Sequence, residues 1–417
     1  MTFLDRAVLI VAAVAASTGS AALATEYTLN TLTAFNGTNG KGPAAGLIAD
    51  AEGNLYGTTA MGGVNNDGTV FEIAAGTHAL STLATFNGAN GSTPLCNLII
   101  DASGNLYGTT AGNSVDNNGT VFEVSAGTHA LSTLAIFNLA NGGGPSAGLL
   151  ADASGNLYGT TREGGANNLG TVFELAAGTH VLSTLVTFIG SNGQYPSGAL
   201  IADVSGNLFG TTDYGGAGGN GTVFQIAAGT HALSTLATFN HNSTNGAIPD
   251  CTLLADANGN LFGTTSSGGG GPTIHGNVFE LSAGTHELST LATFDVTNGA
   301  FPLAQALIVD GSGNLYGTTN GLTRADGTVF EVAAGTHALS TLVTFNGTNG
   351  LYPYGGLIAD ASGNLYGTTS LGGPGGDGTV FELMPVPEPS ALVLAVLAVI
   401  ALLLTGSHYR HSHRTTW

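Results

Sequence analysis

Basic side chains are nearly absent from this chain of 417 residues, which carries 6 lysines and arginines against 26 aspartates and glutamates. The imbalance is strongest between residues 25 and 389, where 25 acidic residues face three basic ones and the formal charge is −22. A nucleic-acid-binding surface needs clustered lysines and arginines that displace the counterions of the phosphate backbone. Their scarcity excludes nucleic acid as a partner, whereas solubility outside the cell and cation binding are compatible with the charge.

Familiar catalytic and cofactor motifs are missing as well. The sequence has no glycine-rich phosphate loop in a strand–helix context, no cysteine and histidine cluster at metal-ligand spacing, and no nucleophile elbow. We therefore expect neither a cofactor nor a metal site. Charged residues make up only 8% of the chain and glycine contributes 67 residues, a composition that some disordered proteins share. The regular spacing of valine, isoleucine, leucine, phenylalanine and tyrosine excludes disorder.

What the chain does have is one motif repeated seven times, Gly-Asn-Leu-Tyr/Phe-Gly-Thr-Thr. Each unit also contains an apolar run that ends in Asp before the motif, and Gly-Thr-Val-Phe-Glu-Leu and a Ser-Thr-Leu-x-x-Phe run after it. Four strand-like runs within about 50 residues match the size of one β-propeller blade, so we expect an all-β propeller. The copies recur every 50 to 54 residues, at Gly53, Gly104, Gly155, Gly206, Gly259, Gly313 and Gly363.

The ends of the array predict a closed ring of seven four-stranded blades over residues 25–383. Six units finish with the Ser-Thr-Leu-x-x-Phe strand, but the seventh stops at residues 381–383 without one. The missing strand stands at the other end of the chain, at residues 30–35. A ring explains this split, because the N-terminal strand can complete the last blade and remove its exposed edge.

The two cysteines, Cys96 and Cys251, each lie five residues before the aspartate of their unit, so they hold equivalent positions in blades two and five. Three blades of seven correspond to a rotation of about 154° around the ring axis. A disulfide requires two Cα atoms within about 7 Å of each other. We therefore expect two buried free thiols that pack as small apolar residues.

Both termini predict export. Residues 1–24 fit a signal peptide, with an apolar run over residues 7–16 and a small-residue cleavage site at residues 22–24. At the other end, a proline-rich linker (residues 384–390) precedes an apolar helix (residues 391–406) and a basic tail (residues 407–417). Such a helix would span about 25 Å, which is short for a transmembrane helix but sufficient. The tail is expected on the cytoplasmic side.

Pro387, Glu388 and Pro389, followed by the apolar helix and the basic tail, closely resemble the PEP-type C-terminal sorting signal (PEP-CTERM) of bacterial exported proteins. The resemblance implies recognition by exosortase-type sorting machinery and transient or stable anchoring in the membrane. It also implies a final location in the cell envelope, at the outer surface or outside the cell. Histidines dilute the arginine cluster of the family in this tail, a departure that bears on removal of the tail by the exosortase more than on membrane engagement.

The repeat itself carries a second resemblance. Asp-x-x-Gly-Asn-Leu-Tyr-Gly-Thr-Thr looks like the blade motif of two-component-regulator-type extracellular propellers. The whole unit, including Gly-Thr-Val-Phe-Glu and the fourth strand, closely resembles the GloVer-type (Gloeo/Verruco) tandem repeat of bacterial exported proteins. All seven units fit this pattern. That family has no assigned reaction, so the resemblance implies a fold and a location and leaves the activity open.

Residues present in nearly every blade are interpreted as structural, because an active site breaks the symmetry of a repeat. A turn role is favoured over calcium binding for the repeated aspartates, since no second carboxylate follows them. The repeated histidines of adjacent blades are expected roughly 15 Å apart, too far to share a metal ion. The aspartates are Asp50, Asp101, Asp152, Asp203, Asp256, Asp310 and Asp360, and the histidines are His78, His129, His180, His231, His286 and His337.

Chemistry is expected where the repeats differ, in the loops between the second and third strands and between the fourth strand and the next blade. In a four-stranded meander both sets leave the same side of the ring, called here the variable-loop face. Variable loops on a rigid scaffold often carry binding sites, and tyrosine suits both sugar rings and partner surfaces. The alternative is that these loops merely tolerate variation. The predicted ligand contacts are Arg162, Tyr195, Tyr214, Arg324, Tyr352 and Tyr354.

Two functions remain open. The first is a non-catalytic binding or structural protein of the envelope, whose partner is an extracellular polysaccharide or a surface protein. The second is an extracellular glycan-active enzyme, a lyase or hydrolase, that uses the variable-loop face or the axial channel. Hydrolysis would require two carboxyl groups about 5–9 Å apart. An acidic cluster unique to one blade, in a deep cleft, would favour the enzyme, and a flat loop surface would favour binding.

Overall fold

The computed structural model describes residues 26–112, 118–240, 245–268, 274–303, 305–321 and 327–386. The chain divides into two units, of which Leu29–Met384 is described below; the other comprises residues 1–28 and 385–417. The predicted signal peptide, PEP motif, apolar helix and basic tail lie outside the described residues. Within the described ranges, no helix is long and apolar enough to cross a membrane.

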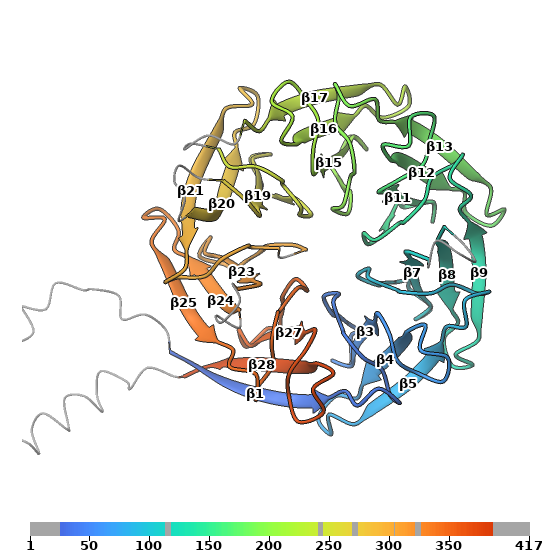
Figure 1. The fold of residues 1–417 in the computed structure, drawn as a ribbon, viewed down its shortest axis with the longest axis vertical. Coiled ribbons are helices and arrows are strands. Elements are labelled where there is room, and N and C mark those ends of the chain that lie inside the picture. The colour runs from blue at the N-terminus through green and yellow to red at the C-terminus, as the bar shows by residue number, and fades with distance from the viewer. Residues whose placement is uncertain are drawn as a thin grey trace, which may run out of the picture. The chain divides into compact units, whose positions relative to one another are not determined.

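Seven four-stranded antiparallel sheets surround a central axis, as Figure 1 shows. In each sheet the first strand has only two residues, and the longer fourth strand lies at the outside of the ring. Six sheets are formed by four consecutive strands, and the seventh has the order β1-β28-β27-β26. This arrangement confirms the predicted all-β, seven-bladed propeller.

The strands of the seven blades have the following bounds. Blade one has β2 (Ile48–Ala49), β3 (Leu55–Thr59), β4 (Thr69–Ile73) and β5 (Leu80–Thr85). Blade two has β6 (Ile99–Ile100), β7 (Leu106–Thr110), β8 (Thr120–Val124) and β9 (Leu131–Ile136). Blade three has β10 (Leu150–Ala151), β11 (Leu157–Thr161), β12 (Thr171–Leu175) and β13 (Leu182–Thr187). Blade four has β14 (Ile201–Ala202), β15 (Leu208–Thr212), β16 (Thr222–Ile226) and β17 (Leu233–Thr238). Blade five has β18 (Leu254–Ala255), β19 (Leu261–Thr265), β20 (Ile274–Leu281) and β21 (Leu288–Asp295). Blade six has β22 (Ile308–Val309), β23 (Leu315–Thr319), β24 (Thr328–Val332) and β25 (Leu339–Thr344). Blade seven has β26 (Ile358–Ala359), β27 (Leu365–Thr369), β28 (Thr379–Pro385) and β1 (Tyr27–Ala34).

The glycine inside each second strand makes room for a phenylalanine of the third strand. In blade three, Gly159 pairs directly with Phe173, which is fully buried. A Cβ atom at Gly159 would lie 2.6 Å from Cζ of the Phe173 ring, a distance at which atoms overlap. The sequence predicts a bulge or a close approach of neighbouring blades at this glycine. This prediction is wrong, because β11 and β12 pair without a bulge at Gly159 and the atoms nearest its Cβ position belong to Phe173 and Leu149 of the same blade.

Phenylalanine pairs also join the blades to one another. The Phe that ends each fourth strand packs against the third-strand Phe of the next blade, with ring centroids 4.8 to 5.2 Å apart and edge-to-face or tilted geometry. Such pairs contribute about 0.5–1.5 kcal/mol beyond the area that they bury. The seven pairs are Phe35–Phe71, Phe86–Phe122, Phe137–Phe173, Phe188–Phe224, Phe239–Phe279, Phe294–Phe330 and Phe345–Phe381.

The two threonines of the repeated motif have different buried partners. In six blades the second one pairs with a threonine of the third strand, as Thr161 does with Thr171 at 2.8 Å between the two hydroxyl oxygens, whereas in blade five Thr265 lies opposite Asn277. In the same six blades the first donates a hydrogen bond to a backbone carbonyl of the next blade, whereas the buried hydroxyl of Thr264 in blade five has no partner among the described residues. The six contacts run from Thr58 to Cys96, Thr109 to Ala147, Thr160 to Gly198, Thr211 to Cys251, Thr318 to Gly355 and Thr368 to Ala45.

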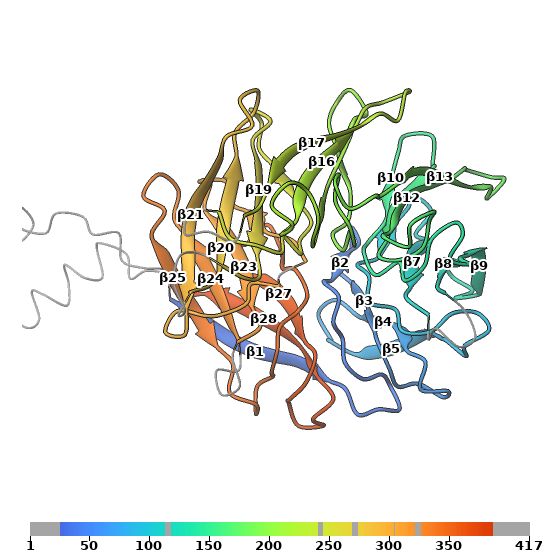
Figure 2. The same cartoon turned by 45° about the horizontal axis from the view of Figure 1, so that its top comes forward.

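The N-terminal strand closes the ring, as predicted. In Figures 1 and 2 the blue strand β1 lies beside the red strand β28, in agreement with the strand order of blade seven. The backbone N–H of Phe35 donates to the carbonyl of Gly378 at 2.9 Å. An ion pair between Lys41 and Asp377, 3.1 Å apart, joins the same two parts of the chain.

Both cysteines are free and buried, which confirms the predicted thiols. The Cys96 thiol donates to the carbonyl of Thr109 at 3.2 Å and accepts from the Thr109 N–H at 3.0 Å. Burial raises the pKa of the Cys96 thiol, so the reactive thiolate is disfavoured. The two cysteines therefore act as core residues of blades two and five.

Candidate functional site

The repeated aspartates hold the turn between the first two strands of each blade. In blade three, Asp152 accepts hydrogen bonds from the backbone N–H groups of Ser154 and Asn156, at 2.8 and 2.9 Å. Its second oxygen accepts from Nδ2 of Asn156 at 2.8 Å and from the hydroxyl of Tyr158 at 3.3 Å. Burial raises the pKa of Asp152, but these hydrogen bonds outweigh burial and leave the pKa below its ordinary value. The carboxylate is therefore committed to the turn.

The repeated histidines also have a backbone role. Each stands in the left-handed region, with φ between 52° and 55°, at the turn before the fourth strand. In blade three, the N–H of His180 closes this turn by donating to the carbonyl of Ala176 at 2.9 Å. The described residues contain no group of three or more histidines, cysteines or acids placed to hold a metal ion.

The two sets of variable loops lie side by side. Isolated β-bridges connect the loop that enters a blade with the loop that follows the second strand of the same blade. These bridges are Lys41–Met61, Gly143–Glu163, Gln194–Tyr214, Ala247–Ser267 and Leu351–Leu371. In these five blades the two sets of variable loops are therefore paired with each other.

Within this face, Arg162 and Asp213 form an ion pair between neighbouring blades. Arg162 directly follows β11 and Asp213 directly follows β15, so the two residues hold equivalent positions in blades three and four. Nη1 of Arg162 lies 2.9 Å from Oδ2 of Asp213. The Arg162 side chain is 43% exposed, whereas that of Asp213 is 3% exposed. A buried carboxylate thus fixes a guanidinium that faces the solvent.

One tyrosine ring contacts the guanidinium, and a second tyrosine packs against the first. Cζ of Arg162 lies 5.8 Å from the centroid of the Tyr195 ring, within the range of a cation–π contact. The Tyr195 and Tyr214 rings meet edge-to-face, with centroids 6.2 Å apart and an interplanar angle of 85°. Backbone hydrogen bonds fix Tyr195 in place, because it accepts from the N–H of Asp213 and donates to the carbonyl of Leu169. We call Arg162, Asp213, Tyr195 and Tyr214 the Arg162 cluster.

Further polar residues surround the buried carboxyl of Asp213. The hydroxyl of Ser197 donates to Oδ1 of Asp213, and the carboxylate of Asp250 lies near enough to repel its charge. Burial and the Asp250 charge raise the pKa of Asp213 to about 7, against the opposing effects of Ser197 and Arg162. Asp213 therefore holds a proton at a pH where an exposed aspartate has lost it.

The structure brings together three of the six predicted contacts, Arg162, Tyr195 and Tyr214. Tyr352 and Tyr354 lie in the connection between blades six and seven, in another sector of the ring. Ser370 donates to the Tyr352 carbonyl from its N–H and its hydroxyl, at 3.0 and 3.2 Å. Arg324 lies outside the described residues.

Ser197 and Asp250 were not among the residues that the sequence singled out. Each directly follows the proline that enters a blade, and so does Tyr354. This position differs from blade to blade, which is the signal that could have identified it. Its occupants in blades one to seven are Ala44, Leu95, Ser146, Ser197, Asp250, Leu303 and Tyr354.

The axis of the ring is crossed by a side chain. Nε2 of Gln305, in the segment that enters blade six, donates to the carbonyl of Leu95, in the segment that enters blade two, at 2.9 Å. These blades lie on opposite sides of the ring (Figure 1). This contact occupies the place where an axial active site would lie.

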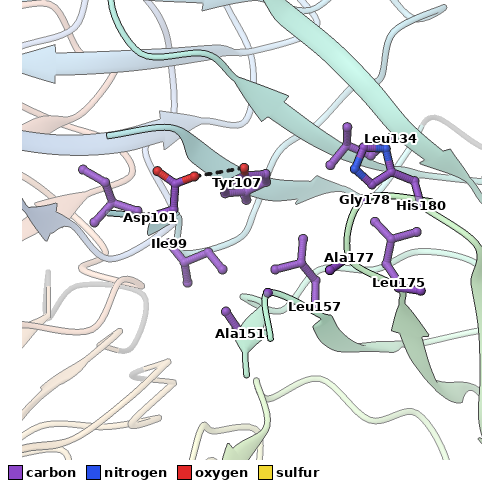
Figure 3. Close-up of a pocket in the computed structure, with 13 residues that line it drawn as sticks. Ile99, Asp101, Tyr107, Leu134, Ala151, Leu157, Leu175, Ala177, Gly178 and His180 are labelled. Atoms are coloured by element: carbon purple, nitrogen blue, oxygen red, sulfur yellow. Dashed lines mark hydrogen bonds between the residues drawn. The ribbon is translucent and has the colours of Figure 1, made fainter. Parts of the chain in front are cut away.

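Five cavities among the described residues lie between neighbouring blades, at the constant turns. They have volumes of about 180 to about 600 Å³. Figure 3 shows the one between blades two and three, where Asp101 and Tyr107 face His180 across an apolar wall. None of the six predicted ligand contacts lines any of these five cavities.

Comparison with solved structures shows the same fold in distant proteins. One is the extracellular domain of a protein described as a hybrid two component system, BT4673 from B. thetaiotaomicron, at 12% identity and a TM-score of 0.56. The alignment covers 85% of this chain but only 39% of that one, so this protein spans well under half of its length. Another is an oligogalacturonate lyase in complex with manganese, at 12% identity and a TM-score of 0.56, covering 88% of this chain and 94% of that one.

No curated protein matches the chain. The family model of the Gloeobacter/Verrucomicrobia repeat matches residues 20–152, 97–320 and 268–396, which together take in all seven blades. The match agrees with the resemblance seen in the repeat unit. This protein therefore belongs to the Gloeobacter/Verrucomicrobia repeat family.

Proposed function

We propose that this protein is an exported propeller of the bacterial cell envelope that binds an extracellular polysaccharide through its variable-loop face and catalyses no reaction. The Arg162 cluster carries the proposal, because it breaks the sevenfold repetition with an exposed guanidinium beside a pair of packed tyrosine rings. Aromatic rings pack against the apolar faces of sugars, and variable loops on a rigid scaffold are common binding sites.

The free donors of Arg162 favour a sugar that carries a carboxylate or sulfate group. A guanidinium has five N–H donors, and the ion pair with Asp213 uses Nη1. The other described basic residue, Lys41, is paired with Asp377. In the described part of this acidic protein, Arg162 is thus the cation best placed to bind an anionic ligand. Bidentate contact with a planar anion is the geometry in which arginine binds most strongly.

The proposed location rests on the two termini. A signal peptide at residues 1–24 would direct export, and the PEP motif with its helix would engage an exosortase-type machinery at the membrane. Cell fractionation of the full chain and of a chain lacking residues 384–417 tests this. We expect the full chain in the envelope and the truncated chain in the medium. Equal distribution of both would contradict anchoring by the C-terminal segment.

A glycan array probed with residues 25–384 tests the binding role. We expect acidic glycans to be retained by the unchanged protein and lost by Arg162→Ala. Tyr195→Ala and Tyr214→Ala should weaken binding, while the paired change Tyr352→Ala and Tyr354→Ala shows whether the second sector contributes. Melting temperatures of all variants control for folding. Undiminished binding by Arg162→Ala would place the ligand elsewhere.

A glycan-active enzyme, a lyase or hydrolase, is the second candidate, and one observation favours it. Asp213 has a raised pKa beside a second carboxylate, Asp250, which is a pattern found in active sites. However, Asp213 is 2% exposed and hydrogen-bonded below the guanidinium, so a substrate would meet Arg162 first. Release of sugar fragments from acidic polysaccharides, abolished by both Asp213→Asn and Asp250→Asn, would establish the enzyme.

A further inference from the structure

A cavity of the same construction recurs at five contacts between neighbouring blades. One wall comes from the Asp turn of the preceding blade and the other from the Ala-Gly-Thr-His or Ser-Ala-Gly-Thr-His turn of the following blade. The five cavities lie between blades one and two, two and three, three and four, five and six, and seven and one. None of the five is lined by a lysine or an arginine. Because the same cavity recurs, it is formed by the residues that the repeat units share. It does not involve the Arg162 cluster.

The cavity between blades two and three has an apolar floor and a polar rim. Ile99, Leu134, Leu157 and Leu175 line it, and it has a volume of about 180 Å³. Figure 3 shows the carboxylate of Asp101 hydrogen-bonded to the hydroxyl of Tyr107 on one side and the imidazole of His180 on the other. This combination suits a ligand with an apolar body and a polar end.

Two acidic side chains lie at the Tyr107 hydroxyl: Asp101, which lines the cavity, and Glu123, which lies beside the lining. The Tyr107 hydroxyl oxygen lies 3.1 Å from Oδ2 of Asp101 and 3.5 Å from Oε1 of Glu123. A phenol has one proton, so it can donate to only one of the two carboxylates at a time. Burial, Glu123 and Asp101 raise the pKa of Tyr107 to about 12, so its hydroxyl stays neutral. Asp101 also accepts hydrogen bonds from Ser103 and Asn105, which hold its carboxylate at the cavity wall. The Tyr107 hydroxyl thus lies between two acidic side chains, and no lysine or arginine lines the cavity.

We propose that the cavities whose preceding blade carries the Asp, Tyr and Glu, which are those between blades one and two, two and three, three and four, and seven and one, bind a primary ammonium group carried on an alkyl chain. The methylenes lie on the apolar floor and the ammonium lies at the Asp and Tyr of the rim, beside the Glu. The ammonium has three N–H donors and a positive charge, which complements a rim of acceptors. The methylenes replace water against isoleucine and leucine. A free amine and a lysine side chain of a peptide share this chemistry.

The chain contains a natural neutral version of this rim. Blade four has Phe209 where blade two has Tyr107, and Gln225 where blade two has Glu123. The strand pairing is the same in both blades, so the propeller accepts Gln in place of Glu without a change of register. Glu123→Gln therefore removes one charge from one cavity in a way that the fold already tolerates.

Methyl NMR of isoleucine-labelled protein, titrated with n-pentylammonium chloride, tests the proposal one cavity at a time. Ile99 reports on the cavity between blades two and three, and Ile358 reports on the one between blades seven and one. We expect both methyl signals to shift in the unchanged protein. In Glu123→Gln, the titration midpoint of Ile99 should rise at least fivefold while that of Ile358 stays constant. Glu163→Gln, a charge-matched change of an exposed residue on the variable-loop face, should alter neither midpoint.

Further ligands separate the contribution of the ammonium charge from that of the alkyl chain of the ligand. n-Pentanol should bind at least tenfold more weakly than n-pentylammonium, and each methylene removed from the amine should weaken binding by about fourfold. Cadaverine represents a free amine and pentalysine represents the lysine side chains of a peptide. Whichever of the two binds more tightly identifies the class of ligand that the cavity prefers. Absence of Ile99 shifts would overturn the proposal. So would equal binding of pentanol, or equal effects of Glu123→Gln and Glu163→Gln.

Discussion

The hydroxyl of Thr368 lies 2.8 Å from the carbonyl oxygen of Ala45, a residue 323 positions away in the chain. Thr160 makes the same contact with Gly198, at 3.2 Å and a separation of 38 positions. The seam that joins the last blade to the first is thus built from the same hydrogen bond as an interface inside the array. The edge-to-face pair of Phe35 and Phe71 repeats this equivalence in the core.

Replacing Thr368 with valine should destabilise the ring as much as the same change at an internal interface. Thr368→Val and Thr160→Val each remove one buried hydrogen bond with little change of volume, so we expect each to lower the free energy of unfolding by about 1 kcal/mol. Urea denaturation of both variants measures this. A clear loss for Thr160→Val with none for Thr368→Val would show that the seam is not closed in solution.

Deletion of residues 25–36 should lower the melting temperature by many degrees. The deletion removes β1, so β28 becomes an unpaired edge, and it also removes Phe35 from its pair with Phe71. Loss of the aromatic side chain alone costs about 3–5 kcal/mol when it is buried. Thermal unfolding followed by circular dichroism is the measurement, and a chain lacking only residues 1–24 is the control. Equal melting temperatures for the two chains would refute closure by β1.

Gly159→Ala should be destabilising although alanine is usually favoured over glycine. The new Cβ atom would overlap Cζ of Phe173, so the ring must move within a close-packed interface, at a cost of about 1–3 kcal/mol. Gly311→Ala is the matched control, because no heavy atom lies within 4 Å of its Cβ position. We expect the control to be neutral or slightly stabilising. Similar free energies of unfolding for both variants would contradict the packing described here.

Stability should decrease as the pH rises from about 4 to about 7, because of Asp213. Its pKa is higher in the folded protein than in the unfolded chain, so in this window the folded state holds a proton that the unfolded chain has released. The free energy of unfolding then falls with rising pH, by at most about 1.4 kcal/mol per pH unit. Urea denaturation at several pH values should show this slope in the unchanged protein and not in Asp213→Asn. Glu163→Gln is the control for the loss of one surface charge. If the free energies of unfolding of the unchanged protein and of Asp213→Asn change with pH in parallel, the pKa of Asp213 is not raised.

The ring was predictable because each structural residue recurs at the same position in all seven repeat units. Gly159, Thr160 and Phe173 stand for seven equivalents each, so a local spacing that one copy would leave ambiguous becomes a pattern. The split of blade seven between the two termini then required a closed ring. The inter-blade hydrogen bond of Thr160 was not predicted, since a strand pattern does not show which backbone of the next blade lies opposite.

The candidate site was only partly predictable for the opposite reason, because its residues occur once. Arg162 and Asp213 follow the same motif in successive units, so alignment of the units could have placed them side by side. The left-handed φ of Tyr195 recurs at the residue before the entering proline in every blade, but the serine that follows this proline and approaches Asp213 depends on one pair of neighbouring units. The inter-blade cavities form between two units, so no single unit's sequence reveals them.

The split blade has a consequence for the biosynthesis of this protein. β1 leaves the ribosome first, yet its partner β28 ends at Pro385, some 350 residues later. At synthesis rates of about 5–20 residues per second, β1 waits roughly 20 to 70 seconds for that partner. During this interval its backbone N–H and C=O groups can pair with any other strand, including that of a neighbouring nascent chain. A factor that shields this one strand until the chain is complete would therefore determine the yield of closed rings.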